Sequence, residues 1–557
     1  MFLRYKIAIL FIFISLSVSF GAVPKQEIRA VWLTTNWGLD WPSVAATNEL
    51  SREKQKGELC RILDRLKELH INTVFFQTRL RGDLLYASGY EPWSAVLTGQ
   101  PGKNPGYDPL AFAVEACHQR GLECHAWIVC IPLGSDKQIK SHKNESVVKR
   151  HRELCKYFNG EWYLDPGHPG TAAYLAALAK EIVSRYAVDG IHLDYIRYPE
   201  NARRFPDTDT YRKYAVRGES LADWRKANIT RIVHTLYDEV RRVSPDVKVS
   251  SAPLGKYNTL PGFPSLGWSC IESVYQDPQA WLRDGKQDFI VPMMYYDGHS
   301  FYPFLLDWAH HTYGRMVVSG LGAYRLQAKE GDWAVADIMR QLHTGRNYGV
   351  SGQSFYRAGS VLCNEKGIMD ALASTAYPTP ALLPPMPFLG DSHLTAPQTP
   401  VMSITADSLL FSWRADSGAK GYVLYGSSDW PVDIEESGNM LAANIRDNRI
   451  ALPHNLPGAV RYFAVTAVDR YGNESAPAAF NEPYRMDEKV RYDRKAHVLY
   501  LEKERNFDDI RITDVLGRTL YVGRYAAEIP GIILPPGTYR IGLSGESAQK
   551  EKILLTF

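Results

Sequence analysis

The sequence lacks an excess of charge of either sign. Its 557 residues include 64 Lys and Arg and 61 Asp and Glu, which gives a formal net charge of +3. No basic stripe runs along the chain, so we expect no nucleic-acid partner, because nucleic-acid-binding domains concentrate positive charge on one face. Motifs of the HExxH, GxSxG and Walker types are also missing. Their absence argues against a zinc protease, a serine enzyme of the α/β-hydrolase kind and an ATPase.

Paired cysteines are missing as well. The seven cysteines are scattered at irregular spacing, which is not the pattern of a disulfide scaffold. Cys117, Cys124 and Cys130 lie close in sequence to His118 and His125, so a zinc site is one interpretation. The CxxC spacing of such sites is absent, however, and Cys117 and Cys124 fall in apolar helix and strand patterns. We therefore expect neither a metal nor a cofactor.

A long apolar run occurs at the N-terminus. Arg4 and Lys6 precede an apolar stretch over residues 7–20, and small residues lie at its end. This pattern predicts a signal peptide over residues 1–21. The alternative, an uncleaved anchor, is disfavoured because a membrane-spanning helix needs about 20 apolar residues. We expect an exported protein without a membrane span after cleavage, periplasmic or located at the cell surface or outside the cell.

After this run, short β-branched or aromatic stretches alternate with longer helical patterns. The stretch LCRILDRLKELH, for example, has apolar residues three and four positions apart, as on one face of a helix. Eight strands separated by helices predict a closed (β/α)8 barrel over residues 22–380. A doubly wound open sheet is the alternative, but it usually needs fewer strands, and no Gly-rich phosphate loop follows the first one. The predicted strands are Ile28–Thr34, Asn72–Thr78, Glu123–Val129, Gly190–Asp194, Val247–Ala252, Asp288–Met294, Met316–Leu321 and Gly349–Tyr356.

The C-terminal third is β-patterned. Proline is dense around residues 381–395, which predicts a stiff linker or a segment that wraps around the barrel. Residues 396–483 alternate with period two, and Trp413 and Tyr462 fall where a fibronectin type III-like sandwich keeps its core tryptophan and corner tyrosine. Residues 484–557 predict a further small β-domain.

Candidate catalytic carboxylates follow the predicted strands. Asp194 ends the fourth strand, and Asp297 follows the sixth. Because active sites of such barrels lie at the carboxyl ends of the strands, these two acids form the best-placed pair for glycoside cleavage. Glu200 and Glu91 are further candidates on loops. Asp189 begins the fourth strand at the opposite face, and we expect it to cap or end the preceding helix.

Polar and aromatic residues near the same strand ends are candidates for binding a sugar. Several also have structural interpretations: a histidine inside a strand is often an interior hydrogen-bonding group, a tryptophan is often a packed wall, and an arginine often belongs to an ion pair. The candidates are Arg79, Asp83, His125, Trp127, His192, Tyr195, Arg197, Tyr295 and Tyr296.

The span from Glu27 to about Ala373 resembles the glycosyl-hydrolase-like 10 family of secreted bacterial proteins. The motifs that carry the resemblance are RAVWLTTNWGLDWP, VFFQTRLRGDLLYASGYEPWSAVLTGQPGKNPGYDPLAF, RGLECHAWI, DGIHLDYIRYP, DWRKANI and DFIVPMMYYD, in this order. The resemblance implies a TIM barrel that acts on glycans, and some members resemble lytic enzymes for peptidoglycan strands stripped of their peptides. Two departures stand out. Tyr195 replaces a second Asp of many relatives, and VCIPLG replaces their Asn-Pro-Tyr-Arg after the third strand.

A fainter similarity links DGIHLDYIRYP and MMYYD to chitinase-type barrels of glycoside hydrolase family 18, whose substrate supplies its own acetamido nucleophile. The catalytic Glu of that family's motif has no counterpart here, since Tyr195 and Ile196 follow Asp194. The similarity implies an N-acetylhexosamine in the substrate, with Tyr295 and Asp297 facing the sugar.

The favoured hypothesis is therefore a secreted glycoside hydrolase with paired-carboxylate chemistry, acting on peptidoglycan glycan strands or another N-acetylhexosamine polysaccharide. The alternative is a non-catalytic glycan-binding protein built on a glycosidase barrel, which the Tyr195 departure favours. A metal-dependent enzyme such as a polysaccharide deacetylase is a third possibility, but the sequence lacks a His/Asp metal cluster.

Overall fold

The computed structural model describes most of the chain after the N-terminal segment. The predicted signal peptide lies outside the described residues and stays a prediction. No helix in the described part is long and apolar enough to cross a membrane. The described residues are 23–390, 394–404, 408–453, 456, 460–480, 490–501, 507–535, 537–544 and 551–556.

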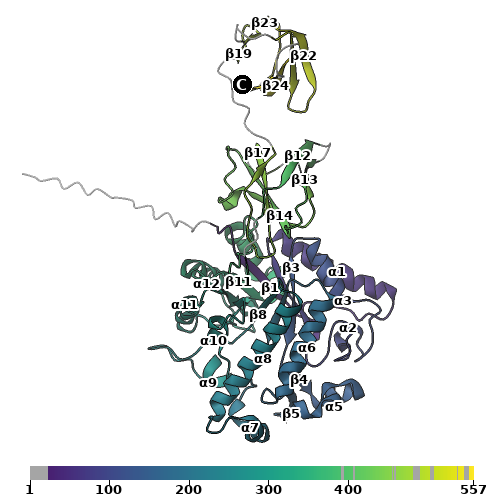
Figure 1. Ribbon diagram of the computed structural model, residues 1–557, viewed down its shortest axis with the longest axis vertical. Coiled ribbons are helices and arrows are strands. Elements are labelled where there is room, and N and C mark those ends of the chain that lie inside the picture. Colours follow the sequence, from purple (N-terminus) through teal and green to yellow (C-terminus); the bar gives the residue numbers. More distant parts are fainter. Residues whose placement is uncertain are drawn as a thin grey trace, which may run out of the picture.

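Eight parallel strands close into a barrel (Figure 1), which confirms the predicted barrel over the open-sheet alternative. Around the barrel the order is β1-β11-β10-β9-β8-β7-β3-β2. Every strand lies within or overlaps its predicted range, because buried parallel strands are continuous apolar runs that sequence patterns reveal. The strands are β1 Ile28–Leu33, β2 Thr73–Arg79, β3 Glu123–Val129, β7 Gly190–Asp194, β8 Lys248–Ser251, β9 Phe289–Ile290, β10 Met316–Leu321 and β11 Gly352–Tyr356.

Helices surround the barrel and bury one apolar face each. Helix α1 (Glu49–Glu68) starts at a capping box, in which the Asn48 side chain accepts a hydrogen bond from the Ser51 amide, and it buries Leu59, Leu63 and Leu66. The other longer helices are α3 Pro109–His118, α6 Pro169–Arg185, α8 Leu221–Val243, α11 Tyr302–His310 and α12 Val335–Tyr348. Shorter helices are α2 Ala95–Thr98, α4 Asp136–Ser141, α5 Val147–Arg150, α7 Thr208–Tyr214, α9 Cys270–Val274, α10 Pro278–Arg283, α13 Ala358–Leu362 and α14 Ile368–Ala371.

The loop between β3 and α6 carries a small antiparallel sheet of its own. Its strands are β4 Pro132–Ser135, β5 Cys155–Phe158 and β6 Glu161–Leu164, in the order β4-β6-β5. Because this loop follows the carboxyl end of β3, the inserted sheet lies on the same end of the barrel as the last residue of β7, Asp194.

The proline-rich segment wraps across the opposite, N-terminal end of the barrel. The Glu27 amide donates to the Leu382 carbonyl at 2.8 Å, and the Leu382 amide donates to the Lys25 carbonyl at 2.9 Å. Met386 is buried in the same cluster as barrel-interior side chains such as Ile28 and Met316. The sequence left two roles open for this segment, a linker or a wrapping segment. Over residues 382–386 the chain wraps around the barrel.

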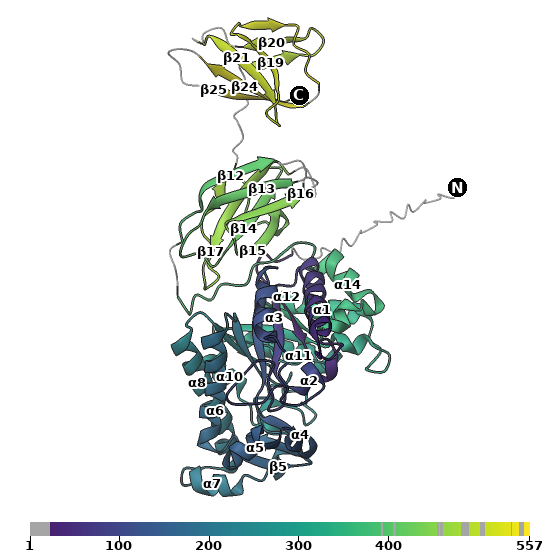
Figure 2. The same ribbon diagram turned by 90° about the vertical axis from the view of Figure 1, so that its right-hand side faces the viewer.

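Two further β-units follow, each of two antiparallel sheets (Figure 2). In the first, Trp413 is buried in the core and Tyr462 packs partly exposed against Trp430. Its fibronectin type III assignment stays a prediction. The sheets of the first unit contain β12 Gln398–Ile404, β13 Ser408–Arg414 and β16 Arg449–Pro453, and β14 Gly421–Ser427, β15 Met440–Ile445, β17 Tyr462–Val468 and β18 Ala478–Ala479. Those of the second contain β19 Val490–Asp493, β20 Val498–Leu501 and β23 Glu528–Pro530, and β21 Asp509–Asp514, β22 Thr519–Arg524, β24 Thr538–Ser544 and β25 Glu551–Thr556.

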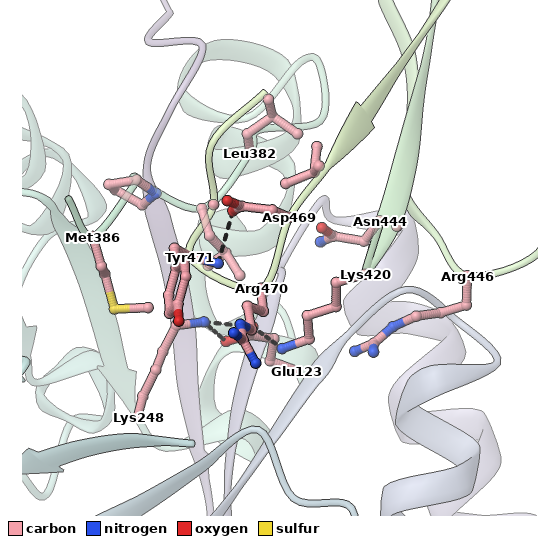
Figure 3. Close-up of a pocket in the computed structure, with 15 residues that line it drawn as sticks. Glu123, Lys248, Leu382, Met386, Lys420, Asn444, Arg446, Asp469, Arg470 and Tyr471 are labelled. Carbon is pink, nitrogen blue, oxygen red and sulfur yellow. Dashed lines mark hydrogen bonds and ion pairs between the residues drawn. The ribbon is translucent and has the colours of Figure 1, made fainter. Parts of the chain in front are cut away.

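A network of buried charges joins the first β-unit to the barrel at the N-terminal ends of the strands. Lys248 contacts Glu123 at 2.5 Å from within the barrel, and Lys420 of the β-unit reaches Glu123 at 3.4 Å from the other side (Figure 3). Burial opposes the negative charge of Glu123, but the two ammonium groups hold the pKa of Glu123 below its ordinary value.

Asp189 belongs to the same network. The helix-end role expected from the sequence is not found, because α6 ends at Arg185 with Tyr186 as its C-cap residue. Asp189 accepts hydrogen bonds from the Cys124 amide at 2.9 Å and lies 2.8 Å from His118. Lys420 and Arg446 of the β-unit each approach its Oδ1 at 3.1 Å. The β-unit is therefore docked at the end of the barrel that lies opposite to Asp194.

We predict that Lys420→Met lowers the free energy of unfolding by about 1–3 kcal/mol, since it leaves Asp189 and Glu123 with fewer cations in a buried place. Lys366→Met, which removes an ion pair with exposed Asp332, is the matched control and should cost less than about 1 kcal/mol. Denaturant unfolding of both variants checks this. Equal losses in the two variants would show that the interface contributes no more than a surface pair.

Candidate active site

A pocket of about 210 Å³ opens at the carboxyl ends of the barrel strands. Side chains alternate along a strand, so those of His192 and Asp194 in β7 share the interior face, and Asp194 is the last residue of the strand. The pocket is lined by Trp32, Thr34, Asn36, Gln77, Leu80, Arg81, Trp127, Val129, Asp194, Tyr195, Ala252, Met293, Tyr295 and Tyr356. Asp194, Trp127, Tyr195 and Tyr295 are the sequence candidates that the structure brings together here.

Asp194 is the one carboxylic acid among the described residues that line this pocket. The Trp127 Nε1–H donates to its Oδ2 at 3.1 Å, and the Tyr195 amide donates to its Oδ1 at 2.7 Å. Only 5% of the residue is exposed. Burial raises the pKa of Asp194, and the positive charge of Arg197 with the two hydrogen bonds offsets only part of this effect. The carboxyl group is thus oriented by two donors and biased toward its protonated form.

Aromatic rings form the walls of the pocket. Tyr295 and Tyr356 are stacked, with ring centroids 5.6 Å apart and an interplanar angle of 30°, and Tyr324 packs edge-on against both. Tyr195, which is 37% exposed, adopts a left-handed backbone conformation with φ 48°. Flat apolar faces with hydroxyl tips match the two surfaces of a sugar ring, its C–H face and its hydroxyl rim.

The two candidate histidines lie in the barrel interior and do not line the pocket. The Trp32 Nε1–H donates to His192 Nε2 at 3.0 Å, and burial lowers the pKa of His192 well below its ordinary value. A neutral imidazole that accepts from Trp32 orients this wall of the pocket. His125 lies deeper, 3.0 Å from Glu123. Both histidines therefore fit the interpretation as interior hydrogen-bonding groups better than the interpretation as residues that contact the sugar.

Arg79 also lies away from the pocket. A β-bulge shifts the register, so that Gln77 pairs with Trp127 while Arg79 pairs with Ile128. This shift turns Arg79 out of the barrel interior, where it donates to both carboxylate oxygens of Glu91 at 2.6 and 2.8 Å and is fully buried. Arg79 and Glu91 therefore form a structural ion pair, and neither is free to contact a sugar.

Asp83 lies in a second hollow beside the pocket, of about 410 Å³. It is almost fully buried, and its Oδ2 is 3.7 Å from His142 Nε2. Burial raises the pKa of Asp83 to about 7, against the hydrogen bonds from Ser94 and the Arg81 amide. Asp83 thus exchanges its proton close to neutral pH.

The remaining candidates surround the pocket without lining it. Asp297 and Glu200 are exposed. The Arg197 guanidinium lies 4.3 Å above the Tyr195 ring and helps to hold that wall. Tyr296 does not line the pocket, and the Lys256 ammonium lies 4.7 Å from the centroid of its ring. The structure therefore does not bring either predicted carboxylate partner into the pocket beside Asp194.

Several pocket residues were not among the sequence candidates. Arg81 lines the pocket and pairs with Glu161 of the inserted sheet at 2.7 Å. Trp32 and Tyr356 could have been found from the sequence, because they occupy inward positions near the ends of predicted strands. Glu161 could not, since it comes from a loop excursion that no strand pattern predicts.

Residues suited to metal binding are not gathered in the described part of the chain, which holds no group of three or more His, Cys, Asp or Glu side chains placed for a metal ion. Cys117 and Cys124 are buried free thiols. The zinc interpretation thus finds no support in the described residues.

We predict that Asp83→Asn changes how stability depends on pH. Because the pKa of Asp83 is raised in the folded protein, the wild type loses stability as the pH rises from about 4 to about 7, and the variant does not. From pH 5 to pH 8 the variant should gain on the order of 2 kcal/mol relative to wild type. Thermal unfolding across this pH range checks this, with exposed Asp332→Asn as control. A difference independent of pH would contradict it.

Comparisons with known proteins agree with the geometry. Residues 27–318, more than half of the chain, match the family described as Glycosyl hydrolase-like 10. The chain is 29% identical over 425 residues to "Glycosyl hydrolase YngK" of Bacillus subtilis (strain 168), which covers 72% of this chain and 82% of that protein. It is 34% identical over 290 residues to "Glycosyl hydrolase DigH" of Escherichia coli (strain K12), with 49% of this chain and 66% of the relative covered.

Among solved structures, the PgaB (BpsB) glycoside hydrolase domain from Bordetella bronchiseptica aligns with a TM-score of 0.45 and 13% identity, over 63% of this chain and 99% of that one. The family match contains Asp194, Trp127, Tyr195 and Tyr295 together with most of the barrel. The chain belongs to the glycosyl hydrolase-like 10 family.

Proposed function

We propose that this protein is a glycoside hydrolase that cleaves an N-acetylhexosamine-containing glycan, with peptidoglycan glycan strands as the favoured substrate. The observation that carries the proposal is the carboxyl group of Asp194, buried and held in an aromatic pocket at the carboxyl ends of the barrel strands. Membership of the family and the hydrolase names of YngK and DigH support a glycan as the substrate.

Asp194 acts in this proposal as the general acid. Glycoside cleavage needs a proton on the leaving oxygen, and an acid serves best when its pKa is raised toward the working pH. Burial raises the pKa of Asp194. The donors Trp127 and Tyr195 keep the carboxyl in one orientation at the floor of the pocket.

The paired-carboxylate mechanism expected from the sequence needs a second acid within about 5–9.5 Å of the first. Asp297 and Glu200 are exposed and do not line the pocket. We therefore propose that the substrate supplies the nucleophile, as in the substrate-assisted glycosidases.

In this mechanism the acetamido oxygen of a sugar ring attacks the anomeric carbon of the same ring, while the bond between that carbon and the leaving oxygen breaks. Asp194 donates its proton to that leaving oxygen. A water molecule then opens the cyclic intermediate, and its proton returns to Asp194, which restores the acid. Tyr195 and Tyr295 line the same pocket, and in this proposal they hold the acetamido group.

Export is part of the proposal, because glycan strands of the cell wall lie outside the cytoplasm. Its support is the N-terminal pattern, in which Arg4 and Lys6 precede the apolar run over residues 7–20.

A glycan-binding protein without catalysis is the second candidate function. The observation that favours it is the single carboxylic acid among the described residues lining the pocket, since a barrel that has lost its second acid retains its aromatic walls. The two candidates differ in product formation and not in binding.

We predict that Asp194→Asn lowers kcat by about 10²–10⁴-fold, the usual contribution of a general acid, while oligosaccharide binding persists. Because the pKa of Asp194 is raised, wild-type activity should fall on the alkaline side, as the acid loses its proton. Reducing-end release from peptide-free glycan strands, with products identified by mass spectrometry, measures the change. Binding by the wild-type protein with no product from any glycan would favour the second candidate.

We also predict that Asp297→Asn and Glu200→Gln each change kcat by less than about threefold, since neither carboxylate lines the pocket and a loss at a paired acid would reach at least about 100-fold. Glucose oligosaccharides, which lack the acetamido group, should not be cleaved. A loss at either position as large as that of Asp194→Asn would restore the paired-carboxylate mechanism.

A further inference from the structure

The pocket around Asp194 is one part of a longer groove. Its volume of about 210 Å³ is below the range of roughly 300–1,000 Å³ typical of ligand sites. The neighbouring hollow of about 410 Å³ shares Asn36, Leu80 and Arg81 with it. A ligand that fills the first pocket and continues over these three residues therefore enters the second.

Trp37 lies on the wall of this second hollow and is 85% exposed. Its backbone is in the left-handed region, with φ 53°, which a residue with a bulky side chain rarely adopts. Gly38, also left-handed at φ 66°, completes the turn. The turn thus holds a large apolar side chain in solvent, where it adds nothing to the core, and strain of this kind concentrates at ligand sites.

The turn is tied to the floor of the pocket. The side-chain oxygen of Gln77 accepts hydrogen bonds from Thr34 Oγ1 and the Thr35 amide at 2.9 Å, and from the Asn36 amide at 3.0 Å. Gln77 itself lines the pocket that contains Asp194. Hydrogen bonds to the buried Gln77 side chain, together with the contact of the Thr34 amide with Asp40, thus fix the turn that carries Trp37 beside the Asp194 pocket.

The second hollow also contains groups that bind hydroxyls. Asp83, Ser94 and Arg81 line it from the side of β2 and its following loop. An exposed indole face beside such polar groups is suited to a pyranose ring, which stacks its C–H face and donates and accepts hydrogen bonds at its rim.

We propose that this hollow is a second sugar-binding subsite in which Trp37 is the stacking platform for a ring further along the glycan. The inference rests on the proposed function for its ligand class, since the groove leads from Asp194. With this subsite, the binding affinity depends on the length of the oligosaccharide, because chains long enough to reach Trp37 make a contact that shorter ones lack.

The test measures binding of β-1,4-linked N-acetylglucosamine oligomers of increasing length by calorimetry, in the Asp194→Asn background. Trp37→Ala should weaken the long oligomers by about tenfold and leave the shortest unchanged, as expected for loss of one aromatic stack. Trp37→Tyr should restore most of the loss. Trp430→Ala, at a tryptophan 37% exposed on the first β-unit, is the matched control.

The outcomes separate the two proposals. Equal affinities of Trp37→Ala and its parent at every length overturn the subsite, even if the wild type cleaves the oligomers. Length-dependent loss, with no product released from peptide-free glycan strands by the wild type, keeps the subsite and overturns the hydrolase. No binding of the oligomers at any length by the parent overturns the subsite, and the hydrolase then depends on product release from peptide-free glycan strands alone.

Discussion

The desolvation of one carboxyl group is the constraint on which the site depends. Asp194 ends a strand whose side chains alternate between the helices and the barrel interior, and this alternation places its carboxyl among rings. A charge is costly there, so the pKa of Asp194 is raised, in the direction that the proposed general acid requires. The hydrogen bonds from Trp127 and Tyr195 orient the group without cancelling that bias.

The two ends of the barrel differ in structure: one end binds the β-unit, and the other contains the proposed site. At the N-terminal ends of the strands, the ion pairs of Lys420 with Glu123 and Asp189 and the wrapping segment around Met386 hold the β-unit in place. At the carboxyl ends, Asp194 has no salt-bridge partner at hydrogen-bonding distance among the described residues. This division follows the general behaviour of (β/α)8 barrels, in which loops after the strands vary with chemistry and the opposite end supplies stability. Among the described residues, none of those that line the two hollows comes from the β-unit.

The barrel could be predicted from the sequence because eight apolar runs and the helices between them are local patterns. The last residue of β7 was predictable for the same reason, and Asp194 lies in the pocket. The position of Arg79 could not be predicted in this way, because a β-bulge reverses the direction in which the last side chain of β2 points. The positions of Asp297, Glu161 and Trp37 depend on loop paths and long-range contacts such as those of Gln77, which no periodicity encodes. Asp297, the predicted partner of Asp194, thus lies outside the pocket, and the path of its loop cannot be predicted from a strand pattern.

The most direct measurement is a crystal structure of the Asp194→Asn variant with a bound N-acetylglucosamine oligomer. The account predicts a glycosidic oxygen within hydrogen-bonding distance, about 2.6–3.2 Å, of the side chain at position 194, with the acetamido group of the adjacent ring folded toward its anomeric carbon. A scissile bond held beside another carboxylate, with position 194 out of reach, would contradict the central role of Asp194.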